Sequence, residues 1–274
     1  MAILDVERAD GVAWVTIDHP PDHLVDAALI GALATTVPAL EADPGVRVAV
    51  FRSTDPDFFL MHGDVHGILA MPASDGTPVT APNAAAAFFE RLHRSPLVTI
   101  GVLDGYARGG GAELLAALDY RIASDRSVLG QPEVPMGILP GAGGTARLAR
   151  LLGRGRALEV ILSGRDVPAD EACTLGWVHE VVPVAGLDAR VTALATRLAS
   201  APPESIAAVK RVLDASLAGL DVALVAESAE FVRLTDAGHH REPMARFLAA
   251  GGQTRAAEAG PIDPLLDAMR RADD

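Results

Sequence analysis

The sequence predicts an α/β protein whose chain continues into a helical C-terminal region. Strand and helix patterns alternate as far as about residue 183, which is typical of βαβ-type units. From about Leu187 onward, the apolar residues have the period of a helix. The predicted helical segments lie near 187–200, 204–217, 220–237 and 242–250. We therefore expect an α/β core over residues 1–186 and a helical region over residues 187–274.

The composition is that of a chain that can bury a sizeable core, because half of its 274 residues are apolar. The formal net charge is −13, and no Lys/Arg cluster stands out. Such a surface repels phosphate backbones and anionic lipid, so we expect neither nucleic acid nor a membrane as a partner. The single cysteine, Cys173, excludes an intrachain disulfide. The first 18 residues carry scattered charges rather than a signal-peptide core, and we expect a soluble, cytoplasmic protein.

The first elements are two strands near 2–7 and 12–18, and Asp10-Gly11 between them is suited to a tight hairpin. The apolar spacing from Asp26 to Glu41 predicts a helix, which Pro38 should kink or shorten. The β-branched run that follows, from Val46 to Phe51, favours a buried strand.

A long stretch over residues 52–82 has no strong periodicity and is typical of a binding loop, a lid or disorder. After it, the pattern predicts a helix at Asn83–Arg94 and a strand at Leu97–Leu103. An apolar helix near Ala112–Leu118 comes next. Short strands and a turn-rich stretch then follow, near Tyr120–Ala123, Val128–Gly130 and Gly137–Gly144.

Three successive glycines, Gly109-Gly110-Gly111, precede the apolar helix. Each glycine destabilises a helix by roughly 0.5–1 kcal/mol relative to alanine, so a triplet indicates that the backbone approaches something closely. Free amides at a helix start favour a ligand oxygen that carries negative charge. The alternative is tight packing of strand against helix. A dinucleotide-binding motif is excluded, because the spacing is not G-x-G-x-x-G.

Two glutamates stand beside these turns. Glu113 lies on the first turn of the apolar helix, where it is either a partner for the helix dipole or a functional carboxylate. Glu133 lies between a short strand and the turn-rich stretch, and by itself it is an ordinary loop acid. No histidine or acidic cluster has metal-ligand spacing, and no G-x-S-x-G nucleophile motif occurs.

Three segments of the chain together carry the signatures of a known family. They are Ser95-Pro96 through Glu113 and on to Ser124, Gly130-Gln131-Pro132-Glu133 through Arg147-Leu148, and Leu162-Ser163-Gly164-Arg165 through Val181-Val182-Pro183. They resemble the enoyl-CoA hydratase/isomerase (crotonase) family, over roughly residues 3–215 and most specifically over 95–183. The resemblance implies a spiral of ββα units with a C-terminal helical region for trimerisation, as a homotrimer or a dimer of trimers. It also implies an acyl-CoA thioester substrate, with no cofactor beyond that CoA and no metal.

The family's site residues map onto particular positions of this sequence. In that mapping the backbone amides of Met61 and Gly110 form an oxyanion hole that holds the thioester oxygen as it gains enolate charge. Glu113 and Glu133 hold a water, one acting as base and the other carrying the proton at the α-carbon. Further residues placed around the substrate or the water are His62, Gly63, Asp64, Gly109, Pro132 and Gly141.

Both glutamates are present, as in the hydratases of the family, whereas many of its isomerases retain only one. The resemblance therefore favours a lyase of fatty-acid type that adds water across a 2-enoyl-CoA. Isomerisation, carbon–carbon lyase action, thioester hydrolysis and a non-catalytic acyl-thioester-binding role stay open. The chain departs from the family at Met61-His62, which should reshape the acyl pocket. It also lacks the basic C-terminal motif near Phe247–Gly252, so contacts to a CoA 3′-phosphate fall to Arg52, Arg108 or a neighbouring subunit.

Overall fold

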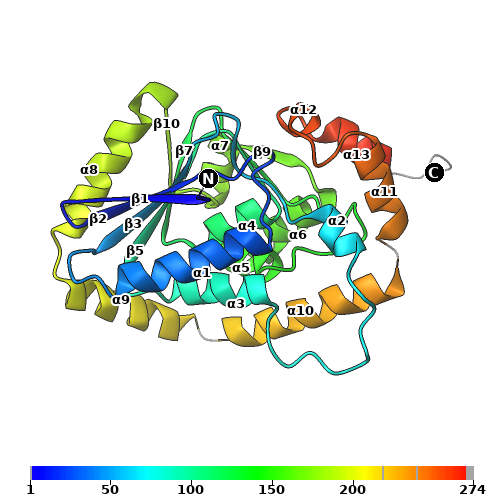
Figure 1. The fold of residues 1–274 in the computed structure, drawn as a ribbon, viewed down its shortest axis with the longest axis horizontal. Helices are drawn as coiled ribbons and strands as arrows, with labels where there is room; N and C mark the ends of the chain where they lie inside the picture. The colour runs from blue at the N-terminus through cyan, green and yellow to red at the C-terminus, as the bar shows by residue number, and fades with distance from the viewer. Residues whose placement is uncertain (1, 218, 239, 270–274) are drawn as a thin grey trace.

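A six-stranded sheet forms the centre of the fold in this computed structural model, which describes residues 2–217, 219–238 and 240–269 (Figure 1). Its strands, in spatial order, are β1 (Leu4–Ala9), β2 (Val12–Ile17), β3 (Val48–Ser53), β5 (Val98–Leu103), β7 (Tyr120–Ser124) and β10 (Glu180–Val182). Strands β1 and β2 are antiparallel and the other pairs are parallel. Asp10 and Gly11 have φ of 52° and 82°, which makes the tight hairpin that the sequence predicts.

A second, four-stranded sheet lies beside the first. Its order is β4 (Phe58–Leu60), β6 (Tyr106–Arg108), β8 (Val128–Gly130) and β9 (Asp166–Pro168), with β9 antiparallel to β8. Three of these strands, β4, β6 and β9, are not predicted from the sequence, because three residues are too few to show a period. Strand β4 and helix α2 (Val65–Leu69) also show that the stretch 52–82 is not one continuous loop.

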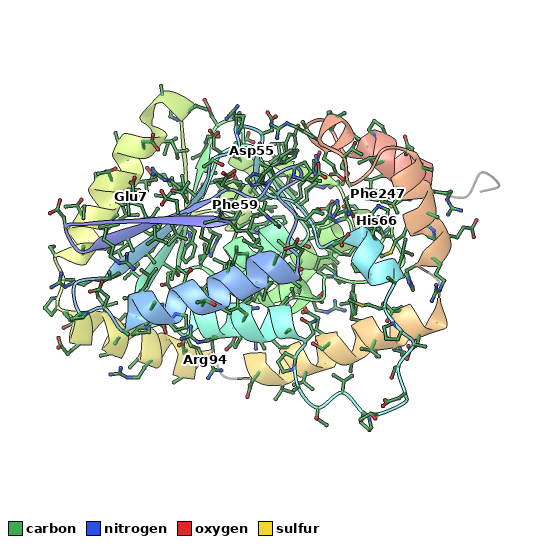
Figure 2. All side chains as sticks on the ribbon, in the orientation of Figure 1. Glu7, Asp55, Phe59, His66, Arg94 and Phe247 are labelled. Carbon is green, nitrogen blue, oxygen red and sulfur yellow. The ribbon has the colours of Figure 1, made fainter. Side chains whose placement is uncertain are left out.

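Helices cover both faces of the larger sheet. On one face α1 (Ala27–Glu41), α3 (Ala84–His93) and α4 (Gly110–Ala117) pack against side chains such as Val15 and Phe51. On the other face α8 (Leu187–Ala199) packs against Val50 and Ile100. Figure 2 shows Phe59 between the layers and Arg94 projecting from the end of α3.

Helix α1 runs through Pro38 to Glu41, so the prediction that proline shortens it is wrong. The proline lies in the last turn, where its missing N–H removes one hydrogen bond, and the amide of Ala42 still donates to the Pro38 carbonyl at 3.0 Å.

The helical C-terminal region is present as predicted. The chain first completes the core through α5 (Gly144–Leu151), α6 (Arg154–Ser163), α7 (Ala169–Leu175) and a 3₁₀ turn at Val184–Gly186. After α8 follow α9 (Pro203–Ser216), α10 (Leu220–Ala237), α11 (Arg241–Ala249), α12 (Arg255–Glu258) and α13 (Asp263–Met269). Helix α10 passes beneath α5, and α11 to α13 then return beside α2 (Figure 1). None of the helices built from described residues is long and apolar enough to cross a membrane.

An apolar cluster fixes the end of the chain to the core. Met244, Phe247 and Leu265 from the C-terminal helices pack with Val65 of α2 and with Met136. The C-terminal region is therefore not an appendage, because its helices close over the segments that carry the predicted site.

Candidate active site

The glycine triplet lets the start of α4 approach the segment after β4. The amide of Gly111 donates to the Met61 carbonyl at 2.8 Å, and the amide of Gly109 donates to the Gly130 carbonyl at 3.0 Å. A Cβ on Gly111 would lie 2.1 Å from the Leu60 carbonyl oxygen, so no larger residue fits there. Tight packing therefore accounts for Gly111, whereas the amide of Gly110 has no acceptor among the described residues.

The first predicted oxyanion donor is corrected by the structure. The amide of Met61 donates to the carbonyl of His23 at 2.9 Å, so it is not free to hold a ligand oxygen. Two residues further on, the amide of Gly63 has no acceptor among the described residues. Val25 brings Gly63 close to Gly110, since it forms a parallel bridge with Gly63 and lies 2.9 Å from a Cβ built on Gly110.

Glu113 is buried on the first turn of α4, with 3% of its surface exposed. Its Oε1 accepts hydrogen bonds from the amides of Ala142 and Gly144, each at 2.8 Å. These amides belong to the turn-rich stretch before α5, which the sequence singled out without assigning it a partner. One oxygen of Glu113 is thus fixed by two backbone donors, and the carboxylate is held in one orientation.

Glu133 is equally buried but is bonded differently. Its Oε1 lies 2.5 Å from the position of a Cβ on Gly109, and its Oε2 has no hydrogen-bond partner among the described residues. Gly109 has φ of +48° and faces His62 as well as Glu133. A glycine is required there for two reasons, its left-handed backbone and the lack of space for a side chain.

A third buried carboxylate, Glu227 of α10, joins these two and was missed by the sequence analysis. Its Oε1 accepts from the amide of Gly143 at 2.5 Å, and its Oε2 accepts from the amide of Ala146 at 2.9 Å. A signal for it exists in the sequence. Glu227 is three residues after Leu224 and four before Phe231, which places an acid on the apolar stripe of a helix.

Burial raises the pKa of all three carboxyl groups, and the charge of a neighbouring carboxylate raises the pKa of Glu133 and Glu227 further. Burial raises the pKa of Glu113 to about 7, although the amides of Gly144 and Ala142 and the charge of Arg147 lower it. Burial, with the negative charge of Glu113, raises the pKa of Glu227 to about 8. Glu133 has no amide donor to its carboxylate from another residue, and burial, then Glu113, raises its pKa well above the usual value. Glu113 is therefore the carboxyl group that ionises most readily near neutral pH.

Two residues from the second predicted segment link the site to the end of the chain. His62 has its Nδ1 2.8 Å from the Gly63 carbonyl and its Nε2 2.9 Å from Glu258 Oε1. Burial lowers the pKa of His62, but the charge and hydrogen bond of Glu258 outweigh this and the pKa is raised. Asp64 caps α2 through the amide of His66 and accepts from the Gln253 side chain at 2.7 Å. Both side chains thus fix the backbone on either side of Gly63.

The remaining predicted residues lie in the two turns after β8. Pro132 is buried and opens the turn that carries Glu133. The carbonyl of Gly141 accepts from the Asn83 side chain at 2.6 Å, and its amide has no acceptor among the described residues. The amide of Gly141 is therefore available to a ligand.

Arg108 is not available for a phosphate, which corrects one of the options drawn from the sequence. It is 1% exposed and binds both oxygens of Asp166, at 2.8 and 2.7 Å. It also donates to the carbonyls of Glu258 and Gly260, each at 2.8 Å. This guanidinium joins the smaller sheet to the C-terminal segment.

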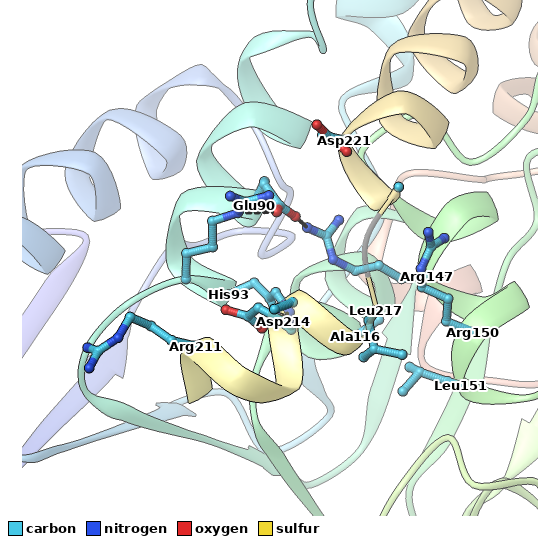
Figure 3. Close-up of a pocket in the computed structure, with 13 residues that line it drawn as sticks. Glu90, His93, Ala116, Arg147, Arg150, Leu151, Arg211, Asp214, Leu217 and Asp221 are labelled. Atoms are coloured by element: carbon cyan, nitrogen blue, oxygen red, sulfur yellow. Dashed lines mark hydrogen bonds and ion pairs between the residues drawn. The ribbon is translucent and has the colours of Figure 1, made fainter. Parts of the chain in front are cut away.

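A cleft of about 590 Å³ lies on the other side of Arg147, between α3, α5, α9 and α10 (Figure 3). Arg147 is buried and donates to Glu90 across it at 2.7 Å. Neither Glu113 nor Glu133 is among the described residues that line this cleft. Within residues 2–217, 219–238 and 240–269, no three His, Cys, Asp or Glu side chains are grouped as a metal site requires.

Comparison with known proteins places the chain in a family. Residues 7–252 match the enoyl-CoA hydratase/isomerase family, and the chain belongs to it. A candidate enoyl-CoA hydratase from Streptomyces avermitilis is 36% identical, with a TM-score of 0.88 over 97% of this chain and 98% of that one. DspI of Pseudomonas aeruginosa is 30% identical, with a TM-score of 0.73 over 86% of this chain and 97% of that one. An enoyl-CoA hydratase/isomerase from Xanthobacter autotrophicus Py2 is 25% identical, with a TM-score of 0.81, over 97% and 96%.

Proposed function

We propose that the protein is an enoyl-CoA hydratase, a lyase that adds water across the double bond of a 2-enoyl-CoA thioester. The observation that carries the proposal is the unequal bonding of two buried carboxyl groups. Glu113 accepts two backbone hydrogen bonds, which favour its ionised form, whereas Glu133 accepts none on Oε2, which favours its protonated form. One base and one acid are thus available together, as the addition of water requires.

The roles follow from this difference. Ionised Glu113 removes a proton from the water, and the oxygen of that water forms a bond to C3. The electron pair of the double bond moves toward the thioester, whose oxygen gains negative charge. Protonated Glu133 then gives its proton to C2, and the thioester carbonyl re-forms. The two glutamates have exchanged protonation states, and one proton passing between them restores the starting state.

The enolate oxygen would be held by the amides of Gly63 and Gly110. These amides replace the pair Met61 and Gly110 in our proposal, because the Met61 amide is already bonded to His23. Removing one such donor typically lowers kcat by about 10²–10³. We assign the amide of Gly141 to the attacking water, and the hydrogen bond from the next residue, Ala142, to Glu113 Oε1 supports this.

The test is turnover of 2-enoyl-CoAs of varied acyl length and branching, with products identified by mass. Loss of conjugated-thioester absorbance together with a gain of 18 mass units supports hydration. Isomerisation leaves the mass unchanged, whereas a carbon–carbon lyase or a thioesterase gives fragments. If every substrate binds and none is turned over, the protein is a non-catalytic acyl-thioester-binding subunit and the proposal fails.

We also propose that the chain assembles as a homotrimer or a dimer of trimers. Exposed apolar side chains on and beside α9 support this, since Val209, Val212 and Val222 are 60%, 70% and 70% exposed in the single chain. Light scattering on the wild type and on Val212→Glu tests it. A wild-type mass of one chain would contradict the proposal.

A further inference from the structure

The turn over residues 142–146 is held from two sides by two carboxylates. The amides of Ala142 and Gly144 donate to Glu113, and those of Gly143 and Ala146 donate to Glu227. Successive amides can point in opposite directions here because Gly143 has φ of +108°. A Cβ on Gly143 would lie 1.9 Å from Nη1 of Arg147, so any other residue would have to displace that guanidinium as well as adopt a strained backbone.

Helix α10 presents a continuous face to this turn. Leu224, Glu227, Ser228 and Phe231 have the i, i+3, i+4, i+7 spacing of one helix side. Leu224 packs on Ala146, and Phe231 lies 2.7 Å from a Cβ built on Gly141. The Ser228 hydroxyl accepts from the amide of Asn83 at 3.0 Å, and the Asn83 side chain in turn donates to the Gly141 carbonyl. The position of the turn therefore depends on α10.

The charges that face Glu227 come from three other segments of the chain. Glu113 lies on α4 and Glu133 follows β8, and both are buried with it. Arg147 on α5 supplies the single positive charge among these groups, and it is also bonded to Glu90 of α3. Three carboxylates and one shared arginine cannot all be ionised in a buried site without strong repulsion. Glu227 therefore acts on Glu113 through the turn and, once it ionises above its pKa of about 8, on Glu133 through its charge.

We propose that Glu227 is a positioning residue for the catalytic carboxylates, which anchors the turn that orients Glu113 and whose charge favours the protonated form of Glu133. The inference rests on the proposed roles of Glu113 and Glu133. It makes the activity depend on a carboxylate from the helical C-terminal region, which sequence motifs in the core do not include.

Two substitutions bear on the two actions of Glu227, and Gln, which has one carbonyl oxygen, can accept from only one of the two amides that Glu227 holds. Glu227→Gln keeps the length of the side chain and removes the charge. With a like charge gone, the pKa of Glu133 should fall, because the negative charge of Glu227 helps to raise it. Glu227→Asp keeps the charge but is too short to reach both amides, so kcat should fall by about ten- to a hundredfold with little change in KM. Glu230→Gln, an exposed position of the same helix, is the matched control.

The titration is measured by ¹³C NMR of the glutamate carboxyl carbons in the protein without substrate. The variants Glu113→Gln and Glu133→Gln each lack one signal and so assign the signals of these two residues. This readout needs no turnover, so it tests the charge effect even if the proposed hydration is wrong. The pH dependence of kcat/KM in the same variants adds the catalytic effect.

A lower pKa of Glu133 in Glu227→Gln, with the pKa of Glu133 in Glu230→Gln unchanged, would support the proposal. An unchanged or higher pKa of Glu133 in Glu227→Gln, in a protein that unfolds like the wild type, would overturn it. If Glu227→Gln does not fold, Glu227→Asp decides the matter, and wild-type kcat in that variant overturns the proposal.

Discussion

Gly109 and Glu133 are in such close contact that there is no room for a methyl group between them. A Cβ on Gly109 would lie 2.5 Å from Glu133 Oε1 and 2.8 Å from the His62 Cβ. The carboxyl group that we assign as the general acid is thus seated directly on the backbone of the helix start. Its position is set by the absence of a side chain rather than by hydrogen bonds to its oxygens.

Substituting Gly109 by alanine should therefore displace Glu133. We expect kcat to fall by at least about 10², because a misplacement near 1 Å has an effect of that size. The positive φ of Gly109 adds a loss of about 1–2 kcal/mol in the free energy of unfolding. The matched control is Gly155→Ala, in helix α6, where a Cβ meets no atom within 4 Å and stability should be unchanged or slightly higher. Full activity in Gly109→Ala would show that Glu133 is not placed by this contact.

The oxyanion donor of Gly110 can be removed without changing a side chain's charge. Gly110 is the first residue of α4, a position at which proline is well tolerated in helices. Because the Cβ of Val25 itself lies 2.9 Å from a Cβ on Gly110, the test uses Val25→Gly as background. In that background Gly110→Pro should lose about 10²–10³ in kcat relative to Gly110→Ala, which keeps the N–H. Equal rates in the two double variants would exclude this amide from catalysis.

The reaction rate should show a bell-shaped dependence on pH. Activity rises as Glu113 loses its proton, with a midpoint near its pKa of about 7. It falls at higher pH as Glu133 loses the proton that it must donate, because the pKa of Glu133 is raised well above the usual value. The profile of kcat/KM against pH measures both limbs. A rate that is flat between pH 5 and 9 would contradict the assignment of both carboxyl groups.

How far the sequence predicts this site differs from residue to residue. Glu113 could be found from the local pattern, because it follows a glycine triplet and lies at the start of an apolar helix. Only 3% of its surface is exposed, as that pattern implies. Glu133 could not be found from the local pattern, because nothing in the turn around it shows which group it faces. It required the family resemblance.

Met61 and Glu227 show where sequence reasoning stops. The choice of Met61 over Gly63 depended on which amide is occupied, and the occupant is the carbonyl of His23, nearly forty residues earlier in the chain. Glu227 lies on the apolar stripe of its helix and Glu230 does not, but the sequence does not show that this stripe packs on α5, which buries Glu227 and leaves Glu230 exposed. The short strands β4 and β6 were missed for a similar reason, because pairing with distant segments defines them rather than their own three residues.

Neutralising Glu113 or Glu133 should remove most of the activity and leave the fold intact. Glutamine is close in size to glutamate and cannot exchange a proton near neutral pH, so each of Glu113→Gln and Glu133→Gln should lose about 10²–10⁴ in kcat. Steady-state rates on the best substrate of the screen measure this. Glu230→Gln again controls for the loss of one negative charge. Near-wild-type rates in both active-site variants would contradict the assignment of Glu113 and Glu133 as catalytic residues.

The raised pKa of Glu133 also predicts how stability depends on pH. The folded protein holds the Glu133 proton at pH values where the unfolded chain has released it, so folding becomes weaker as pH rises through that window. Each such proton contributes at most about 1.4 kcal/mol per pH unit. Glu133→Gln cannot titrate, so its free energy of unfolding relative to wild type should grow between pH 5 and pH 8. Urea unfolding at several pH values in that range measures the difference. A difference that does not change with pH, or that shrinks as pH rises, would mean that the pKa of Glu133 is not raised in the folded protein. Glu133 would then not be the general acid.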